Sequence, residues 1–338
     1  MTGPTVDGAG SDASAPMDRT PASVSRSLSL GDVTITSEPQ QGATYDDLVT
    51  FAGHVERLGF SGWFRSDHFL AMDVEGLPGP TDAWVTLAGL ARETSRIRLG
   101  TLVSSATFRL PGPLAIAVAQ VDQMSGGRVE LGLGAGWFPD EHRAYGIPFP
   151  EVGERFDRFE EQLEVITGLW ATPAGATFNH DGPYYPIVDS PALPKPMQHR
   201  VPIIIGGMGA TRTPYLAARF ATEFNTPFVS LEEFVSQVRR VRAACDAIER
   251  EASTLVYSAA VIVCIGESES DFQRRAGAVT AATGMTADQI RRNYIAGTVD
   301  QAHEAIERWS KAGAQRLHLL PVDPTDVAHL EILAALLS

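Results

Sequence analysis

The stretch RVELGLGAGWFPDEHRAYGIPFP (residues 128–150) decides the fold, because an apolar strand-like run passes directly into a loop rich in glycine, aromatic and charged residues. The alternate glycines at 132–136 permit positive φ angles and a close approach of the backbone to a ligand. Trp137, Phe138 and Tyr145 offer rings that can cover a planar molecule. A GxGxG pattern alone is weak evidence, so the rest of the chain must supply the context.

On both sides of this stretch, short β-rich runs alternate with amphipathic segments of helical period. This rhythm predicts βαβ units and a parallel sheet. One example is VTITSE (33–38), followed by an amphipathic helix over 45–60 that Gly59 ends. About eight such pairs follow one another from Asp32 onward. We therefore predict an α/β fold, a (β/α)8 TIM barrel, with a doubly wound open sheet as the alternative.

The remaining pairs follow from the same pattern, and between 171 and 200 the pattern fails. There FNHDGPYYPI predicts a small hairpin around Asp181-Gly182, so this segment is an insertion and not a domain. The further predicted strands are 62–66, 96–103, 128–134, 201–207, 221–228, 255–266 and the end of 302–322. The further predicted helices are 81–95 with Thr81 as N-cap, one with Pro113 in its first turn, 151–170, 211–219, 231–251, one from Glu269 and the start of 302–322.

Composition excludes several classes of partner. The 338 residues include 27 Lys and Arg against 41 Asp and Glu, a net charge of -14. Without a long basic block, neither nucleic acid nor a membrane surface is an expected partner. No apolar run approaches the roughly 20 residues that cross a bilayer, so we expect a soluble, cytoplasmic protein with a small-molecule substrate. Cys245 and Cys264 lack metal-ligand spacing and are expected to be buried free thiols.

The first 30 residues are rich in Ser, Ala, Gly, Pro and Thr and lack the apolar core of a signal peptide. Such a segment cannot offset its ordering entropy by burial, so we expect a disordered leader, with docking on a partner subunit as the alternative. Residues 31–338 are expected to form one domain. No GxSxG elbow and no HExxH pair occurs, so neither a serine hydrolase nor a zinc protease is indicated, and no metal site is expected.

In a barrel of this kind the carboxyl ends of the strands carry the chemistry. The predicted ends are Ser66–His68, Val103–Ser105, Ala135–Trp137, Gly206–Gly209 and Asn225–Thr226. Glycine, hydroxyl, imidazole and carboxylate groups are thus expected to gather at one end of the barrel.

Five motifs, in order and spacing, resemble the bacterial luciferase-like family of flavin- and deazaflavin-dependent oxidoreductases. The resemblance covers about residues 32–335, and its branch that uses coenzyme F420, an 8-hydroxy-5-deazaflavin, is the most similar. The motifs are SDHF at 66–69, TSRIRLGTLVSSATFR at 94–109, SGGRVELGLGAGWFPDEHRAYGIPFP at 125–150, RFDRFEEQLEVITGLW at 155–170 and PIIIGGMGATRT at 202–213.

The resemblance implies that Asp67 and His68 stand beside the cofactor ring. His68 is then the acid-base residue, since an imidazole gives or takes a proton near neutral pH. The alternative is that the pair only pins the loop after the second strand. The family's non-prolyl cis peptide would fall at Leu102–Val103, as a bulge behind the ring. The same resemblance places Ser104, Ala135, Gly136 and Trp137 at the cofactor.

For the cofactor phosphate, the resemblance points to the loop before the helix that begins near Thr211. Gly206, Gly207, Met208 and Gly209 would offer backbone amides beside the positive helix end, and Arg212 would add charge. The alternative is that the glycines only make a tight turn.

Three further cofactor contacts are implied, each with a purely structural alternative. Arg109 matches an arginine that the family keeps, but a solvated surface ion pair is the alternative. Asn225 and Thr226 match a position that contacts the ring or ribityl chain, with a satisfied strand end as the alternative.

Two departures concern the substrate. Sugar-phosphate dehydrogenases of this family carry a glutamate where this chain has Trp137, and a tryptophan where it has Met72. We therefore do not expect sugar-phosphate oxidation, and an apolar lid of Trp137 and Phe138 suits a hydrophobic or unsaturated substrate. The neighbouring cluster 140–142 (Asp, Glu, His) either supplies a proton or is a solvated loop face.

The resemblance thus implies an F420-dependent oxidoreductase that transfers a hydride between deazaflavin C5 and a small organic substrate, reducing a C=C or C=N bond. The alternatives are an FMN-dependent luciferase-like monooxygenase and a non-catalytic flavin-binding protein. A homodimer is also implied, since barrels of this family pair through helices on one side.

Overall fold

The computed structural model describes residues 27–72, 74–321, 323 and 326–338. Residues 1–26 of the predicted leader lie outside the described residues. Leu28 and Leu30 are described and pack against the core. A short 3-10 helix, Leu30–Asp32, then leads into the first strand.

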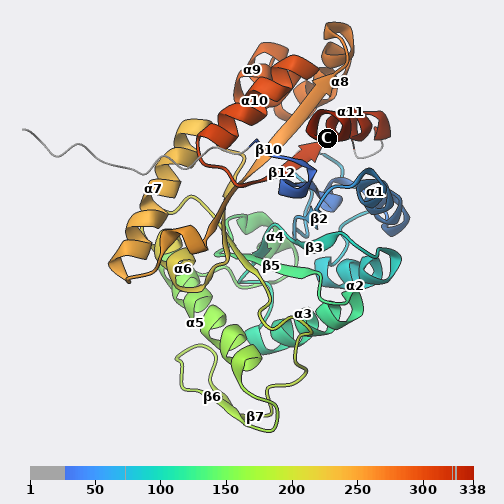
Figure 1. Ribbon diagram of the computed structural model, residues 1–338. Helices are drawn as coiled ribbons and strands as arrows, with labels where there is room; N and C mark the ends of the chain where they lie inside the picture. Colours follow the sequence, from blue (N-terminus) through green and yellow to red (C-terminus); the bar gives the residue numbers. More distant parts are fainter. Residues whose placement is uncertain (1–26, 73, 322, 324–325) are drawn as a thin grey trace, which may run out of the picture.

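Parallel strands form a closed barrel, because β9 pairs with β8 on one side and with β10 on the other. Helices lie between consecutive strands and surround the barrel (Figure 1). The predicted (β/α)8 TIM barrel is therefore confirmed, and the open-sheet alternative is wrong. The barrel strands are β1 Val33–Ser37, β2 Gly62–Arg65, β3 Arg98–Thr101, β5 Val129–Gly134, β8 Ile203–Gly206, β9 Glu223–Pro227, β10 Val256–Gly266 and β12 Arg316–Pro321.

The helices that cover the strands are buried on one face, as their apolar periodicity predicts. Among the described residues they are α1 Tyr45–Leu58, α2 Ala83–Glu93, α3 Pro111–Ser125, α5 Val152–Ala171, α6 Arg212–Phe220, α7 Leu231–Ala247, α8 Glu269–Thr283, α10 Val299–Lys311 and α11 Val327–Leu337. Gly59 ends α1 in the left-handed conformation, with φ +89°, as predicted.

Several short elements decorate this barrel. The 171–200 insertion holds the antiparallel pair β6 Phe178–His180 and β7 Ile187–Ser190, which confirms the predicted hairpin and projects away from the barrel in Figure 1. Other additions are β4 Ser104–Ser105, α4 Pro139–Ala144, α9 Ala287–Asn293, β11 Ile295–Thr298 and the 3-10 turns Pro39–Gln41 and Ala252–Thr254.

Some predicted boundaries are wrong. Asp82, and not Thr81, caps α2, because its carboxylate accepts hydrogen bonds from the amides of Trp84 and Val85. The third strand ends at Thr101, and α7 ends at Ala247 instead of 251. Sequence periodicity missed β11, which pairs only with the outer end of the long strand β10.

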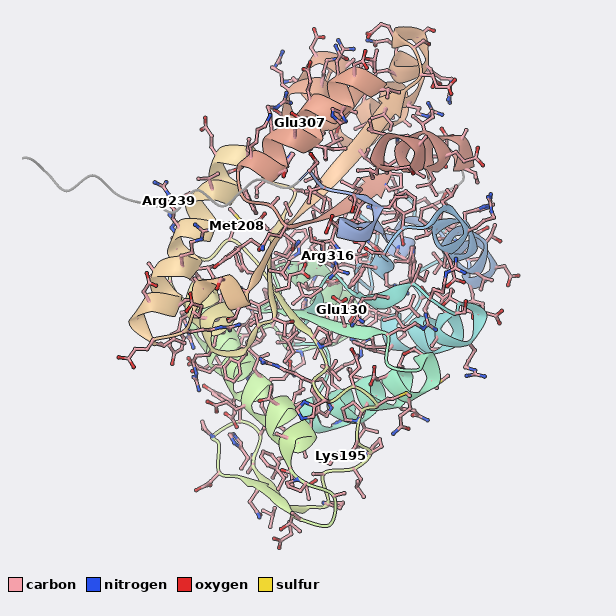
Figure 2. All side chains as sticks on the ribbon, viewed as in Figure 1. Glu130, Lys195, Met208, Arg239, Glu307 and Arg316 are labelled. Atoms are coloured by element: carbon pink, nitrogen blue, oxygen red, sulfur yellow. The ribbon has the colours of Figure 1, made fainter. Side chains whose placement is uncertain are left out.

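The amino ends of the strands enclose a buried ionic network. Arg316 at the start of β12 contacts Glu130 at 2.7 Å and Glu223 at 2.8 Å, and Figure 2 shows Arg316 and Glu130 close together in the centre of the molecule. His318 contacts Glu223 at 2.7 Å. Burial of Glu223 would raise its pKa, but Arg316 and His318 lower it to about 2. This network fills the end of the barrel opposite to the predicted site.

A buried histidine of α11, which bonds to β10, predicts a loss of stability in acid. His329 accepts a hydrogen bond at Nε2 from the amide of Ile265 at 3.0 Å, so it must be neutral. Burial, with Arg275 nearby, lowers the pKa of His329 to about 4. Because the pKa of His329 is lower in the folded than in the unfolded chain, neutral His329 contributes its full stabilisation to the fold above about pH 6.5. This stabilisation is lost as pH falls toward 4, which lowers the free energy of unfolding by up to about 3 kcal/mol.

Urea unfolding followed between pH 7.5 and 4 measures this slope. His329→Gln keeps an acceptor but cannot protonate, so its free energy of unfolding should fall less steeply with acid than that of the wild type. His303, whose side chain is 56% exposed, provides the control His303→Gln. Identical slopes in all three proteins would show that His329 does not titrate on unfolding.

In the described ranges, no helix combines the length and apolarity that a bilayer-spanning segment requires. Both cysteines are buried free thiols, as predicted.

Candidate functional site

The predicted site residues lie at the carboxyl ends of five neighbouring strands. The chain order of these ends is β2, β3 with β4, β5, β8 and β9, which is also their order around the barrel. Residues that are far apart in the sequence are therefore close in space, as the strand-end rule predicts.

Asp67 is the centre of a buried ion-pair network at the end of β2. Its side chain accepts hydrogen bonds from the Ser104 hydroxyl at 2.6 Å and from Arg109 at 2.5 and 3.3 Å. The Arg109 Nη2 group, which makes the longer bond to Asp67, also donates to Asp82 at 2.6 Å. Burial would raise the pKa of Asp82, but Arg109 and the α2 amides lower it overall. Arg109 thus joins the β2, β4 and α2 ends, and the surface ion-pair alternative is wrong.

A cis peptide bond joins Leu102 and Val103, where the resemblance places it. The Val103 side chain lies between two glycines of neighbouring strands. A Cβ added to Gly134 or to Gly206 would lie 3.1 Å from the Val103 methyl groups. Glycine at both positions therefore leaves the room that Val103 needs at the barrel mouth.

His68 bonds with a carboxylate, but not with that of Asp67. Its Nδ1 lies 3.0 Å from both carboxylate oxygens of Glu141 on α4. Its ring meets that of Trp137 edge to face, with centroids 5.7 Å apart, and Trp137 itself is 65% exposed. Asp67 and His68 therefore belong to two separate pairs, Asp67 with Arg109 and His68 with Glu141.

The second histidine of the loop holds the backbone in place. His142 Nδ1 lies 2.7 Å from the Phe138 carbonyl oxygen, so this nitrogen is the donor. Its Nε2 then accepts from the Thr107 hydroxyl at 2.6 Å, and Thr107 lies 2.6 Å from the Ser105 hydroxyl. A Cβ on Gly136, with φ +79°, would clash with that hydroxyl of Ser105.

The solvated-face interpretation of residues 140–142 is wrong for two of the three. Glu141 and His142 are each only 1% exposed. Asp140 is solvated, with a half-exposed side chain paired to Arg143 at 3.0 Å. The α-helical spacing of α4 turns consecutive residues to different sides, which a charge count alone does not reveal.

Some backbone groups of the glycine loop after β8 already form hydrogen bonds within the protein. The Gly207 amide donates to the Asn225 carbonyl at 3.2 Å, and the Met208 carbonyl accepts from Gln237 at 3.0 Å. A Cβ on Gly209 would lie 2.5 Å from the Thr213 hydroxyl. The first amides of α6 follow directly, and its N-cap residue Thr211 makes no side-chain cap.

Arg212 is not available as a free cation in this arrangement. Its guanidinium contacts Asp157 at 2.7 Å and Glu160 at 3.6 Å, and donates to the Gly153 carbonyl at 3.0 Å. The structure therefore ties Arg212 to α5 and not to the glycine loop.

Asn225 and Thr226 lie side by side in β9 and are buried. The Asn225 amide donates to the Ser258 hydroxyl at 2.9 Å, so it fits the satisfied strand end. The Thr226 hydroxyl is buried and has no hydrogen-bond partner among the described residues. Because successive side chains of a strand point to opposite faces, the Thr226 side chain lies on the face of β9 opposite to that of Asn225.

Sequence reasoning missed one acidic residue of the site. Glu38 follows β1, and burial raises its pKa, while the charge of His68 and a hydrogen bond with Gln41 oppose the rise. The only signal was its position as the last residue of a predicted strand. Among the described residues, no three His, Cys, Asp or Glu side chains gather as metal ligands.

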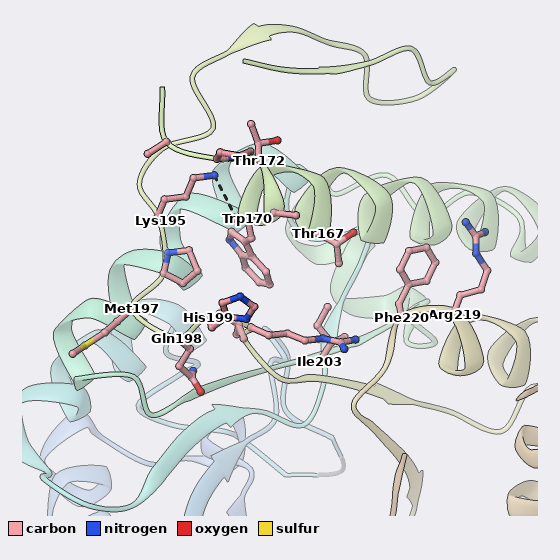
Figure 3. A pocket seen from close by; sticks show the side chains of 16 residues that line it. Thr167, Trp170, Thr172, Lys195, Met197, Gln198, His199, Ile203, Arg219 and Phe220 are labelled. Carbon is pink, nitrogen blue, oxygen red and sulfur yellow. Dashed lines mark hydrogen bonds between the residues drawn. The ribbon is translucent and has the colours of Figure 1, made fainter. Parts of the chain in front are cut away.

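A cleft of about 700 Å³ lies elsewhere, between the ends of α5 and α6 and the segment that precedes β8. Trp170 and His199 point toward one another across it (Figure 3), and the Lys195 ammonium donates to the Leu169 carbonyl at 2.6 Å. This cleft is at the amino end of β8, and none of the predicted site residues lines it. It is therefore separate from the barrel mouth.

Comparison with known proteins finds relatives in sequence and in fold. An F420-dependent glucose-6-phosphate dehydrogenase of Microbacterium testaceum (strain StLB037) is 36% identical over 182 residues, 54% of this chain and 52% of the relative. The chain spans about half the length of the curated relatives that it matches.

Two solved structures share the fold at 19% identity. One is an F420-dependent secondary alcohol dehydrogenase in complex with an F420-acetone adduct, with a TM-score of 0.79 over 90% of this chain and 97% of that one. The other is a coenzyme F420-dependent tetrahydromethanopterin reductase from Methanopyrus kandleri, with a TM-score of 0.76 over 91% and 98%.

The family profile described as Luciferase-like monooxygenase matches residues 28–320, nearly the whole described barrel. This chain belongs to the bacterial luciferase-like family.

Proposed function

We propose that this protein is an F420-dependent oxidoreductase that transfers a hydride between its cofactor and a small organic substrate. The observation that carries the proposal is the barrel mouth itself, where the His68 ring meets the exposed Trp137 and where Val103 packs between two glycines. The F420-dependent relative and fold neighbours support the choice of cofactor.

The residues at the mouth fit such a cofactor. Gly134 and Gly206 flank the Val103 side chain and carry no side chains of their own, and such a platform suits the face of a planar ring. The loop from Met208 to Gly209 and the first turn of α6 offer amides for an anionic tail.

When bound, F420 supplies or accepts a hydride at C5 of its deazaflavin ring. His68 Nε2 gives the substrate the proton that completes its reduction once a new C–H bond has formed, and takes that proton back in the oxidative direction. Trp137 and Phe138, stacked with centroids 5.3 Å apart, limit the access of water to this end of the barrel. Arg109 binds Asp67 and so fixes the ends of β2 and β4 relative to each other.

For the substrate, we propose a small, largely apolar molecule whose C=C or C=N bond is reduced. The support is the exposed ring of Trp137, which stands where sugar-phosphate dehydrogenases of the family carry an acid. Neither the relative named for glucose-6-phosphate nor the fold neighbours support this finer choice, so glucose-6-phosphate and a secondary alcohol belong in the substrate panel as competitors.

An FMN-dependent monooxygenase is the second candidate, because the matching family profile is described as Luciferase-like monooxygenase. Reconstitution separates the two. The proposed enzyme binds F420 and turns over under nitrogen, whereas the monooxygenase binds reduced FMN and consumes oxygen with substrate. Tight binding of either cofactor without turnover of any panel substrate would favour a non-catalytic flavin-binding protein.

A further inference from the structure

The two ring nitrogens of His68 have different surroundings. Nδ1 faces the carboxylate of Glu141 at 3.0 Å, and a carboxylate can only accept. Nδ1 therefore carries the hydrogen. In the neutral ring, Nε2 then has the lone pair, and no hydrogen bond joins it to the described residues. This is the tautomer that an acid-base residue needs if Nε2 is to face the substrate.

Glu141 is itself fixed in place. It is 1% exposed, and its Oε2 also accepts the Phe69 amide at 3.0 Å. The next residue along the chain, His142, is held between the Phe138 carbonyl and the Thr107 hydroxyl, which anchors α4. The carboxylate therefore has little freedom to turn away from the imidazole.

Other charged groups do not compete for this role. Asp67 precedes His68 in sequence, but its oxygens face Ser104 and Arg109. Glu38 faces His68 from the end of β1, close enough to interact through its charge, but no hydrogen bond joins the two. Glu141 is thus the carboxylate that sets the orientation of the ring.

We propose that Glu141 is a positioning residue: it locks the His68 ring and its Nδ1–H tautomer, so that Nε2 takes and gives the proton. This inference rests on the proposed function for its catalytic consequence, but not for the tautomer. A buried carboxylate beside Nδ1 also stabilises the imidazolium that forms when Nε2 takes the proton.

The test replaces Glu141 by Gln, which preserves size but removes the charge and permits either tautomer. Turnover with reduced F420 should fall about 10- to 100-fold, with the dissociation constant of F420 within about twofold of the wild type. The limb of the pH profile on which turnover falls as pH rises should move to lower pH, because His68 gives the proton as an imidazolium and this imidazolium loses its counter-charge. Glu141→Asp should recover part of the turnover.

Asp140→Asn is the matched control, since Asp140 is the preceding residue of α4 but has a half-exposed side chain. It should leave turnover and pH profile unchanged. An unchanged pH profile in Glu141→Gln, or an equal loss in Asp140→Asn, would overturn the positioning role.

Nitrogen NMR of the histidine rings at pH 8 tests the tautomer without cofactor or substrate. In the wild type, His68 should show a protonated Nδ1 and an unprotonated Nε2, and Glu141→Gln should shift this population. If the tautomer is as expected but no cofactor binds, the proposed function fails and the positioning of the ring stands. An Nε2–H tautomer in the wild type would overturn the inference.

Discussion

Replacing His68 by Ala should lower turnover with F420 about 100-fold or more, with the affinity for F420 little changed. The reason is that the proton-transfer group is lost, whereas the glycine platform around Val103 and the amides before α6 remain. Steady-state rates with reduced F420 and a binding titration, done on the same preparation, separate the two quantities.

His303→Ala serves as the control, because this exposed histidine lies on α10 away from the barrel mouth. The double variant of His68→Ala with Glu141→Gln should be no slower than His68→Ala alone, since the two act as one unit. Full turnover in His68→Ala would remove His68 from the mechanism. Additive losses would show that Glu141 has a role of its own.

Replacing Arg316 by Met should lower the free energy of unfolding by about 3–5 kcal/mol. Arg316 lies inside the barrel between Glu130 and Glu223, each only 3% exposed. Methionine removes the Arg316 charge from both buried carboxylates, so that Glu130 keeps only Arg98 and Glu223 keeps only His318 among the described ion-pair partners. Removing one partner of a buried ion pair costs far more than the pair itself contributes.

Urea unfolding at pH 7 measures this loss, and two further variants show its cause. The triple variant Arg316→Met, Glu130→Gln, Glu223→Gln should recover part of the loss, because no buried carboxylate then lacks its Arg316 counter-charge. Lys311→Met breaks an exposed pair with Glu307 and should cost less than about 1 kcal/mol. A loss below about 1 kcal/mol for Arg316→Met would show that the ion pairs of Arg316 are not essential to the stability of the barrel.

The barrel was predictable because its signals are local. Alternating apolar strands and amphipathic helices repeat along the chain, and Gly59 or the 206–209 glycines mark where elements end. The errors at Thr81 and at residue 251 concern ends, where a neighbouring side chain such as Asp82 decides which residue caps the helix. The strand β11 depends on the outer part of β10, a tertiary contact without a local pattern.

The site was predictable in its place but less so in its pairs. Strand ends located Asp67, His68 and Val103, but the partner of each is set by distant loops. Asp67 and His68 are neighbours in the sequence. In the fold, however, Asp67 forms an ion pair with Arg109, and His68 contacts Glu141. Arg212 shows the same limit, because the acidic side of α5 that holds it lies more than 50 residues away in the sequence.

Titration of the purified protein with F420 and with FMN, followed by the fluorescence of each ring, tests the central proposal most directly. We predict saturable binding of F420, with FMN binding more weakly. Absence of binding by F420 in both its oxidised and reduced forms, in a protein that is folded by circular dichroism, would contradict the proposed function.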